Sequence, residues 1–145
     1  MSSNGAGAQS SALVDVTFNS CPNNLQRVRK LVKLRALEQG CSDELVGKLV
    51  LVVDEACANI IRHGYHGDRS GAIRLQLVRV DDRLDFRLRD YAEPVDPACV
   101  KPRDLRECRP GGLGLNFIDT VMDEWAFERP DDGAGNVLLM SRKID

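Results

Sequence analysis

The sequence has few of the residues that build metal sites or disulfide frameworks. It contains 5 cysteines and 2 histidines, an odd number of thiols with no C-x-x-C pair. We therefore expect reduced cysteines rather than a zinc site or disulfides. The cysteines concerned are Cys21, Cys41, Cys57, Cys99 and Cys108.

Long apolar runs and an excess of either charge are also missing. No apolar segment approaches the ~20 residues of a membrane-spanning helix, and the first residues lack the basic and apolar regions of a signal peptide. We therefore expect a cytoplasmic protein without membrane partners. With 20 Lys and Arg against 22 Asp and Glu, a globally basic nucleic-acid binder is disfavoured, so nucleic acid is not an expected partner either.

What is present is typical of one ordinary globular domain. The chain has 145 residues, of which 43% are hydrophobic and 29% charged, values that exclude wholesale disorder. Residues 1–12 have the small, polar composition of a flexible tail. Residues 13–145 are therefore expected to form the domain.

The apolar periodicity predicts an α+β fold. Helical spacing is found at 24–39, from the capping residue Ser42 to about 63, and at 112–121, whereas strands are predicted at 13–18, 73–77, 84–88, 124–129 and 136–143. Helices come early and mostly antiparallel strands late, which indicates a two-layer sandwich with helices on one face of a mixed, mostly antiparallel sheet.

The second predicted helix carries the first candidate site. Glu55, Asn59 and Arg62 fall within roughly 60° of one another around a helix, beside its apolar arc. A carboxylate, an amide and a guanidinium in this arrangement can accept a proton, hold a divalent cation and neutralise phosphate. The alternative is a solvated helix face, because such trios are common.

Two further candidates lie downstream. The glycine-rich run 111–115, GGLGL, precedes a helix, where backbone N–H groups can approach phosphate. It fits neither the dinucleotide-binding nor the P-loop pattern, and an isolated glycine turn is an equally good interpretation. Asp90 ends a strand and could accept a hydrogen bond from an adenine amino group, although strand-ending aspartates are common.

The order of the three motifs along the chain favours functional sites over the structural alternatives given for each motif. The runs are DEACANIIRHGY at 54–65, DYAEPVDP at 90–97, and GGLGLNFI at 111–118 followed by VMDE at 121–124. Over about residues 12–143 they resemble the ATP-binding superfamily of gyrase, histidine kinases and MutL. The E-A-C-x-N…R-H form most resembles bacterial anti-sigma-factor serine/threonine kinases. The resemblance implies the histidine-kinase-like ATPase (Bergerat) fold.

The resemblance also implies roles. Glu55 becomes the catalytic base, Asn59 the protein ligand to Mg²⁺, Arg62 a basic residue near the phosphates and Asp90 the adenine-recognising carboxylate. Residues 92–111 become the lid over ATP. The glycine-rich run is assigned to cofactor binding, with the two middle glycines cradling phosphate: Gly111, Gly112, Leu113, Gly114 and Leu115.

The implied activity is that of an ATP- and Mg²⁺-dependent protein kinase. Its substrate would be a STAS-type anti-sigma-factor antagonist; sequestration of a sigma factor is a second role compatible with the resemblance, and such relatives commonly form homodimers.

Departures from the pattern motivate a second hypothesis. Ala92 stands where the first glycine box begins with Gly, and Glu93-Pro94 replaces a second Gly. The Cβ of Ala92 resists positive φ, and Glu93 adds negative charge near ATP, so both changes would weaken ATP binding. The second hypothesis is therefore a switch that binds a partner protein and binds nucleotide weakly or not at all. A third hypothesis is the catalytic domain of a histidine kinase. It is disfavoured because no dimerisation segment with a phospho-acceptor histidine is found: both histidines, His63 and His66, lie beside the first motif.

Three other side chains are expected to be structural. Cys57 is predicted to be a small core residue, Trp125 a core aromatic and His63 a packed, hydrogen-bonded histidine in the core.

Overall fold

Helices and strands follow the predicted periodicities closely. The computed structural model describes residues 12–94 and 115–144. The helical elements are η2 (Pro22–Asn24), α1 (Leu25–Glu38), α2 (Asp43–Asn59), η3 (Ile60–Gly64) and α4 (Leu115–Val121). The strands are β2 (Val14–Asn19), β3 (Ala72–Val80), β4 (Arg83–Asp90), β5 (Glu124–Glu128) and β6 (Asn136–Lys143). No helix within these described ranges is long and apolar enough to cross a membrane.

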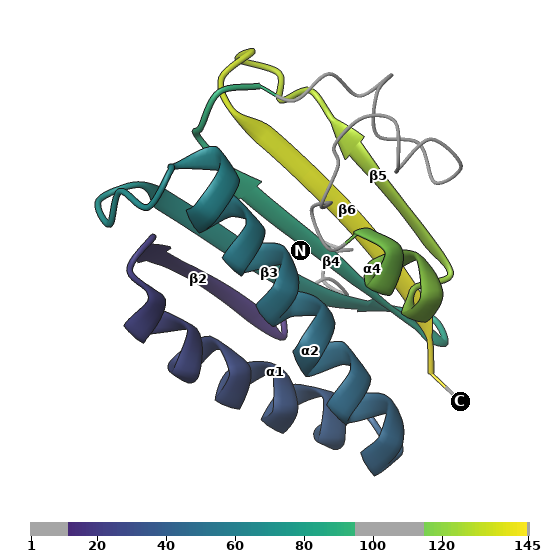
Figure 1. Ribbon diagram of the computed structural model, residues 1–145. Helices are drawn as coiled ribbons and strands as arrows, with labels where there is room; N and C mark the ends of the chain where they lie inside the picture. The colour runs from purple at the N-terminus through teal and green to yellow at the C-terminus, as the bar shows by residue number, and fades with distance from the viewer. Residues whose placement is uncertain (1–11, 95–114, 145) are drawn as a thin grey trace, which may run out of the picture.

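The strands form a five-stranded sheet in the order β2-β3-β4-β6-β5. The pairings of β2 with β3, β3 with β4, β4 with β6 and β5 with β6 are all antiparallel. Helices α1, α2 and α4 lie on the same face of this sheet (Figure 1). The expected two-layer α+β sandwich is confirmed, and each strand pairing of the described residues is antiparallel.

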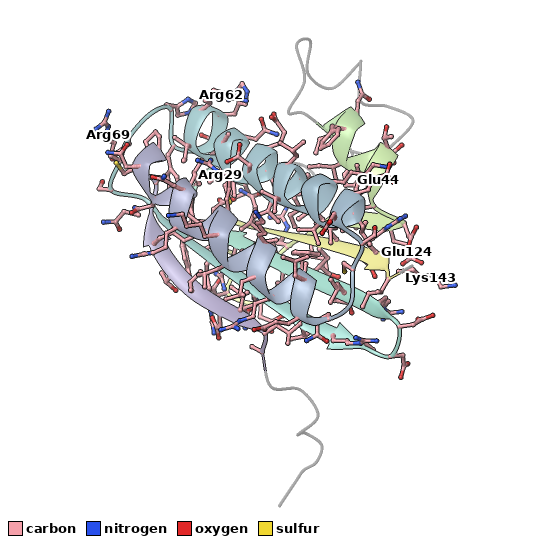
Figure 2. The ribbon with its side chains drawn as sticks, turned by 90° about the horizontal axis from the view of Figure 1, so that it is seen from below. Arg29, Glu44, Arg62, Arg69, Glu124 and Lys143 are labelled. Atoms are coloured by element: carbon pink, nitrogen blue, oxygen red, sulfur yellow. The ribbon has the colours of Figure 1, made fainter. Side chains whose placement is uncertain are left out.

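Helix α2 begins as predicted but ends differently. The Leu45 N–H donates to the Ser42 side chain at 3.1 Å, which caps the first turn. After Asn59 the chain continues as a π-helical turn, η3, in which the Tyr65 N–H donates to the Ile60 carbonyl at 2.8 Å. Figure 2 shows Glu44 and Arg62 at opposite ends of this long helical segment. Such π turns often occur at functional sites.

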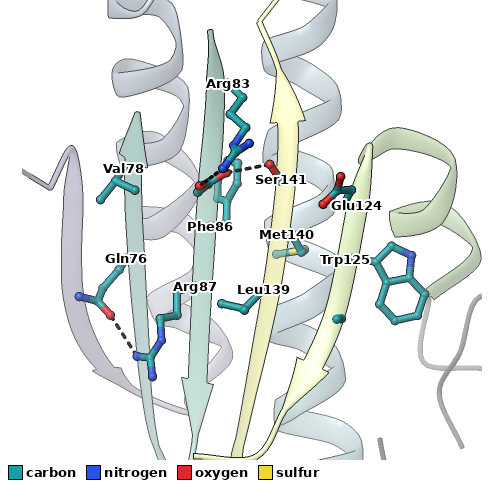
Figure 3. Close-up of a pocket in the computed structure, with 12 residues that line it drawn as sticks. Gln76, Val78, Arg83, Phe86, Arg87, Glu124, Trp125, Leu139, Met140 and Ser141 are labelled. Carbon is teal, nitrogen blue, oxygen red and sulfur yellow. Dashed lines mark hydrogen bonds and ion pairs between the residues drawn. The ribbon is translucent and has the colours of Figure 1, made fainter. Parts of the chain in front are cut away.

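The two faces of the sheet differ in chemistry. Residues that alternate along each strand point either into the helical layer or away from it. On the face opposite the helices, β3, β4 and β6 present Gln76, Arg87 and Leu139, which lie in one cross-strand row. Figure 3 shows this open face of the sheet with the helices behind it.

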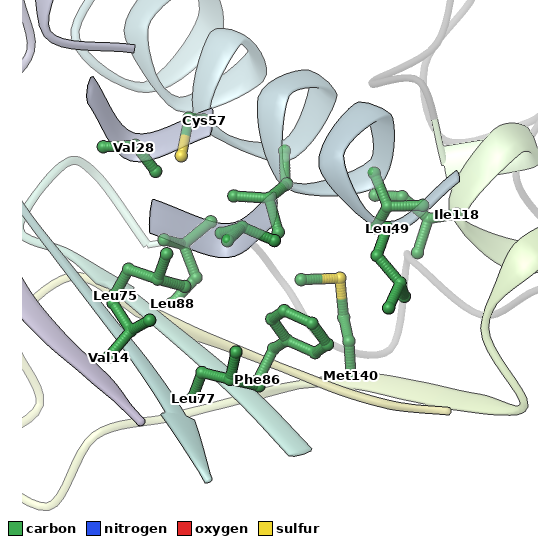
Figure 4. Packing of buried hydrophobic residues seen from close by; sticks show 14 of the residues in the cluster. Val14, Val28, Leu49, Cys57, Leu75, Leu77, Phe86, Leu88, Ile118 and Met140 are labelled. Carbon is green, nitrogen blue, oxygen red and sulfur yellow. The ribbon is translucent and has the colours of Figure 1, made fainter. Parts of the chain in front are cut away.

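The core lies between the sheet and the helices. Leu84, Phe86 and Leu88 of β4 are at most 1% exposed and face inward. Phe86 and Met140 point toward Leu49 of α2 and Ile118 of α4 (Figure 4). Each large side chain buried in this way contributes ~1.5–3 kcal/mol of transfer free energy, so the central strands anchor the fold.

The structural side chains follow the predictions in two of three cases. Cys57 is fully buried, and burial raises the pKa of its thiol to about 12, which makes it an inert core residue. Trp125 packs against the core and donates from its indole N–H to Asp119 at 2.8 Å. The prediction that His63 lies in the core is wrong. The side chain is exposed, because the wider π turn shifts residues after Asn59 off the face they would occupy in a continuous α-helix.

Candidate functional site

The trio predicted on the second helix comes together in the structure. An Arg62 guanidinium nitrogen, Nη2, donates to Asn59 Oδ1 at 3.1 Å and lies 3.4 Å from Glu55 Oε2. Asn59 is 7% exposed, whereas the Glu55 and Arg62 side chains are 36% and 57% exposed. The oxygen atoms that would face a cation therefore already face a positive charge.

The neighbouring carboxylate has a different surrounding. Asp54 Oδ1 accepts from Arg29 Nη1 of α1 at 2.5 Å, a contact between the two long helices. Asp54 thus helps hold α1 against α2, and Glu55 is the carboxylate directed toward Asn59 and Arg62. The two adjacent carboxylates therefore have different partners, and the catalytic role predicted for Glu55 stays a prediction.

Asp90 lies at the buried end of β4. Its Oδ1 accepts hydrogen bonds from the Ala92 N–H at 2.8 Å and from Asn136 Nδ2 at 3.0 Å. Removal from water raises the pKa of this carboxyl, and the hydrogen bonds from Asn136 and Ala92 lower it to a smaller extent. Both of these bonds end on Oδ1.

Ala92 fits its position without backbone strain. Among the described residues only His66 and Asp81 combine a side chain with a positive φ, so Ala92 does not adopt the conformation that a Cβ resists. Ala92 is 8% exposed, and a Cβ on Gly64 would lie 3.0 Å from its methyl group. The extra methyl at position 92 is thus accommodated by a missing one at position 64.

The contact between Gly64 and Ala92 brings the trio of Glu55, Asn59 and Arg62 and the carboxylate of Asp90 to one end of the molecule. Gly64 ends η3, two residues after Arg62, and Ala92 follows Asp90 by two residues. Tyr65 adds a second contact, because its hydroxyl accepts from the Tyr91 N–H at 2.8 Å. The carboxyl ends of the α2–η3 segment and of β4 therefore lie side by side.

Part of the predicted site lies outside the described residues. This applies to Gly111, Gly112, Leu113 and Gly114 and to most of the predicted lid, 92–111. Leu115 is described as the first residue of α4 and is buried in the core at 5% exposure. Its assignment to cofactor binding, like that of the glycines, stays a prediction.

The polar groups present fit a magnesium ion better than a zinc ion. No cluster of three or more His, Cys, Asp or Glu side chains that could hold a metal occurs within 12–94 and 115–144. Mg²⁺ is usually held by one or two protein oxygens together with substrate phosphates and water. Asn59 Oδ1, with Glu55 beside it, offers such oxygens.

Two residues that contact the site, Asn136 and Tyr65, were not predicted from the sequence. Asn136 holds Asp90 and also donates to the Glu93 carbonyl at 3.2 Å; it begins β6, and only the pairing of β4 with β6 places it opposite Asp90. Tyr65 ends the first motif run, but nothing in its spacing indicates a partner 26 residues away.

A groove on the open face of the sheet is separate from this site. It has a volume of about 450 Å³ and contains none of the predicted site residues (Figure 3). It is lined by Gln76, Val78, Arg83, Asp85, Phe86, Arg87, Glu124, Trp125, Ala126, Leu139, Met140 and Ser141.

The chain is similar to proteins of one family. A family model described as the histidine kinase-like ATPase domain matches residues 18–142. Serine-protein kinase RsbW of Bacillus subtilis (strain 168) is 31% identical over 141 residues, which cover 91% of this chain and 86% of that protein. Serine-protein kinase RsbW of Listeria monocytogenes serovar 1/2a is 33% identical over 97 residues, and the match covers 61% of this chain and 62% of that relative.

A solved structure supports the fold. The crystal structure of the RsbU and RsbW domains of Rv1364c from Mycobacterium tuberculosis is similar with a TM-score of 0.62 at 16% identity, over 90% of this chain and 32% of that one. At this identity the likeness bears on the fold alone. Because the family model matches most of the chain and a relative 31% identical is covered over 86% of its length, the chain belongs to the histidine kinase-like ATPase domain family, in which it is similar to the serine-protein kinases RsbW.

Proposed function

We propose that this chain is an ATP- and Mg²⁺-dependent kinase that phosphorylates a serine or threonine of a STAS-type anti-sigma-factor antagonist. The observation that carries the proposal is the meeting of two polar groups at one end of the fold. One group contains Glu55, Asn59 and Arg62, and the other contains buried Asp90 held by Asn136. Together they offer a base, a cation ligand, a phosphate partner and an adenine acceptor.

Glu55 would act on the attacking hydroxyl. Its carboxylate takes the hydroxyl proton as the oxygen bonds to the terminal phosphorus of ATP and the bond to the bridging oxygen breaks, which leaves ADP. Asn59 would hold Mg²⁺, which supplies charge neutralisation when bound, and Arg62 would add its positive charge near the phosphates. The exposure of Glu55 and Arg62 leaves them accessible to a protein substrate.

Asp90 would select the base of the nucleotide. Because Ala92 and Asn136 donate to Oδ1, Oδ2 is the oxygen that accepts from the exocyclic amino group of adenine. Guanine carries a carbonyl at the corresponding ring position and would place two acceptors against each other. We therefore expect a clear preference for ATP over GTP.

The proposal is tested by transfer of labelled phosphate to a cognate serine-bearing STAS protein. Glu55→Gln removes the base and keeps the shape, so transfer should fall by about 10²–10⁴-fold. Asp54→Asn makes the same chemical change one residue earlier, where the carboxylate contacts Arg29, and should keep transfer close to the original rate. Full transfer by Glu55→Gln would show that Glu55 is not the base.

A partner-binding switch is the alternative, motivated by Ala92 and Glu93. The close fit of Ala92 to Gly64 weakens the steric part of that argument, and Glu93, which is exposed, keeps the electrostatic part. Calorimetry with ATP and Mg²⁺ separates the two functions. Saturable binding that Asn59→Ala weakens in the presence of Mg²⁺ supports the kinase, whereas no heat at millimolar nucleotide supports the switch.

We further propose that the chain forms a homodimer through the open face of the sheet. The groove there carries both charges, with Asp85 bound to Arg83 at 3.0 Å and Arg87 bound to Gln76 at 3.3 Å. In an isologous dimer the same patch of both copies forms the interface, and a patch that carries both charges can pair with itself.

Light scattering on the full chain tests the homodimer. The expected mass is that of two chains, and Leu139→Lys, which places a charge in the centre of the groove, should yield one. A single-chain mass for the unaltered protein would contradict the proposal. Sequestration of a sigma factor and action in the cytoplasm belong to the same proposed role.

A further inference from the structure

Tyr65 lies between the two polar groups of the proposed nucleotide site. Its hydroxyl donates to the Ala72 carbonyl at 2.7 Å and accepts from the Tyr91 N–H at 2.8 Å. The side chain therefore joins three segments: the end of η3, the start of β3 and the residue that follows Asp90. Burial raises the pKa of this phenol above its ordinary value, with a smaller contribution from the charge of Asp90, so the hydroxyl keeps the proton that it donates.

The ring of Tyr65 is held by close packing. A Cβ on Gly71 would overlap the ring, so glycine at that position lets the aromatic face lie directly on the backbone. Beside it, Gly64 is close enough to the Ala92 methyl that an added Cβ would meet it at 3.0 Å. Residues 64 and 65 thus contact residues 92 and 91 by packing and by a hydrogen bond.

The contact of residues 64–65 with residues 91–92 lies between the two polar groups. Arg62, three residues before Tyr65, donates to Asn59. The Ala92 N–H, one residue after Tyr91, donates to Asp90 Oδ1. The hydroxyl of Tyr65 therefore lies where it can hold the α2–η3 segment, which carries Asn59 and Arg62, against the end of β4, which carries Asp90.

We propose that Tyr65 is a positioning residue that sets the spacing between Asn59 and Asp90, and so determines how well both ends of one ATP molecule are bound. This inference rests on the proposed function. The physical reason is that one rigid ligand must meet both groups at once, and small misplacements of such groups are costly. A phosphoryl-transfer site depends mainly on positioning, so the alignment of the two ends matters more than the hydroxyl itself.

The test is nucleotide binding by the full chain carrying Tyr65→Phe. The substitution keeps the ring and removes both hydrogen bonds, and we expect about tenfold weaker binding of Mg²⁺-ATP and a smaller preference for ATP over GTP. In the kinase assay the KM for ATP should rise by a similar factor, with kcat changed by less than about threefold. A residue that only stabilises the fold would not change the ATP to GTP ratio.

The chain offers a matched control in its other tyrosine. Tyr91 is 52% exposed, and its ring lies 4.5 Å from the Arg89 guanidinium. Tyr91→Phe makes the same chemical change and leaves the backbone N–H that Tyr65 accepts from in place, so ATP binding and selectivity should stay unchanged. Thermal unfolding of both variants, followed by Trp125 fluorescence, verifies that they are folded at the assay temperature.

A second variant covers the case in which Tyr65→Phe does not fold. Gly64→Ala presses on the Ala92 methyl and should weaken ATP binding in the same way, with recovery in the double variant Gly64→Ala, Ala92→Gly. Unchanged affinity and selectivity in Tyr65→Phe, or in Gly64→Ala when the first is unfolded, would overturn this inference alone. No ATP binding by the unaltered chain would overturn the proposed function and this inference with it.

Discussion

The two polar groups at this end of the molecule are built in different ways. Glu55, Asn59 and Arg62 come from one helical segment, and two of the three are substantially exposed. Asp90 and Asn136 come from strands and meet across 46 residues of sequence, both at most 6% exposed. The exposed side chains of the first group therefore have room to change conformation, whereas burial and hydrogen bonds hold the Asp90 side chain in place.

The energetic consequences follow from burial. An exposed ion pair such as Arg62 with Glu55 contributes little to stability, because water and salt screen it. The buried carboxylate of Asp90 accepts from the Ala92 N–H and from Asn136 Nδ2, so its removal would cost two hydrogen bonds in the interior. Substitutions in the first group should therefore change chemistry, and substitutions in the second should change stability as well.

The largest combined effect is expected for Asp90→Ala. Loss of the carboxylate removes the acceptor of the Ala92 N–H and one of the acceptors of Asn136 Nδ2, so the free energy of unfolding should fall by about 1–3 kcal/mol in urea titrations. ATP binding should be lost with or without Mg²⁺. Asp90→Asn, which keeps an acceptor oxygen, should lose recognition of ATP with a smaller loss of stability. Equal stability losses for the two variants would contradict the assigned hydrogen bonds.

Asn59→Ala should act on the other group alone. Removing the amide oxygen should weaken ATP binding by about 10–100-fold when Mg²⁺ is present, with little change in EDTA, because the side chain is assigned to the cation. Calorimetry with and without Mg²⁺ measures both affinities. An equal loss of affinity under the two conditions would mean that Asn59 binds the nucleotide directly.

The pH dependence should distinguish the buried carboxylate from the exposed one. Burial raises the pKa of Asp90, so the folded protein holds its proton up to a higher pH than the unfolded chain does. The contribution of Asp90 to stability is therefore largest at low pH and is lost as pH rises through the raised pKa. ATP binding, which needs the carboxylate, should weaken by several-fold as pH falls through the same window. Asp90→Asn should remove this step from the stability curve, and a step that persists in the variant would assign it to another group.

The smallest effect on stability is expected for Arg62→Ala. Both partners of this ion pair are more than a third exposed, so the free energy of unfolding should change by less than about 0.5 kcal/mol. ATP binding should become weaker and less sensitive to salt, because a positive charge near the phosphates is gone. A stability loss of more than 1 kcal/mol would show that the exposed group is not the adaptable one.

Much of this fold could be predicted because it follows from local patterns. Alternation in 73–77 and 84–88 predicts the hairpin of β3 and β4, and the Ser42 cap marks the start of α2. The spacing of Glu55, Asn59 and Arg62 was sufficient to bring them together, since residues three and four apart share a helix face. The order of three motifs, which no single motif could replace, indicated the family.

Other features could not be predicted because they depend on contacts between distant segments. The position of His63 follows from a π turn that no residue pattern marks. The fit of Ala92 to Gly64 depends on how η3 lies against the end of β4. Asn136 becomes a partner of Asp90 only because β6 crosses over to pair with β4.

By itself, the sequence determined the helices, the strands, the family and the proximity of Glu55, Asn59 and Arg62, because periodicity and spacing act within a few turns of chain. Only the tertiary structure decided that Asn136 binds Asp90 and that Tyr65 joins the residue after Asp90 to the end of the helical segment. The physical reason is that burial and strand pairing arise from the whole fold, and a hydrogen bond across 46 residues leaves no periodic trace in the chain.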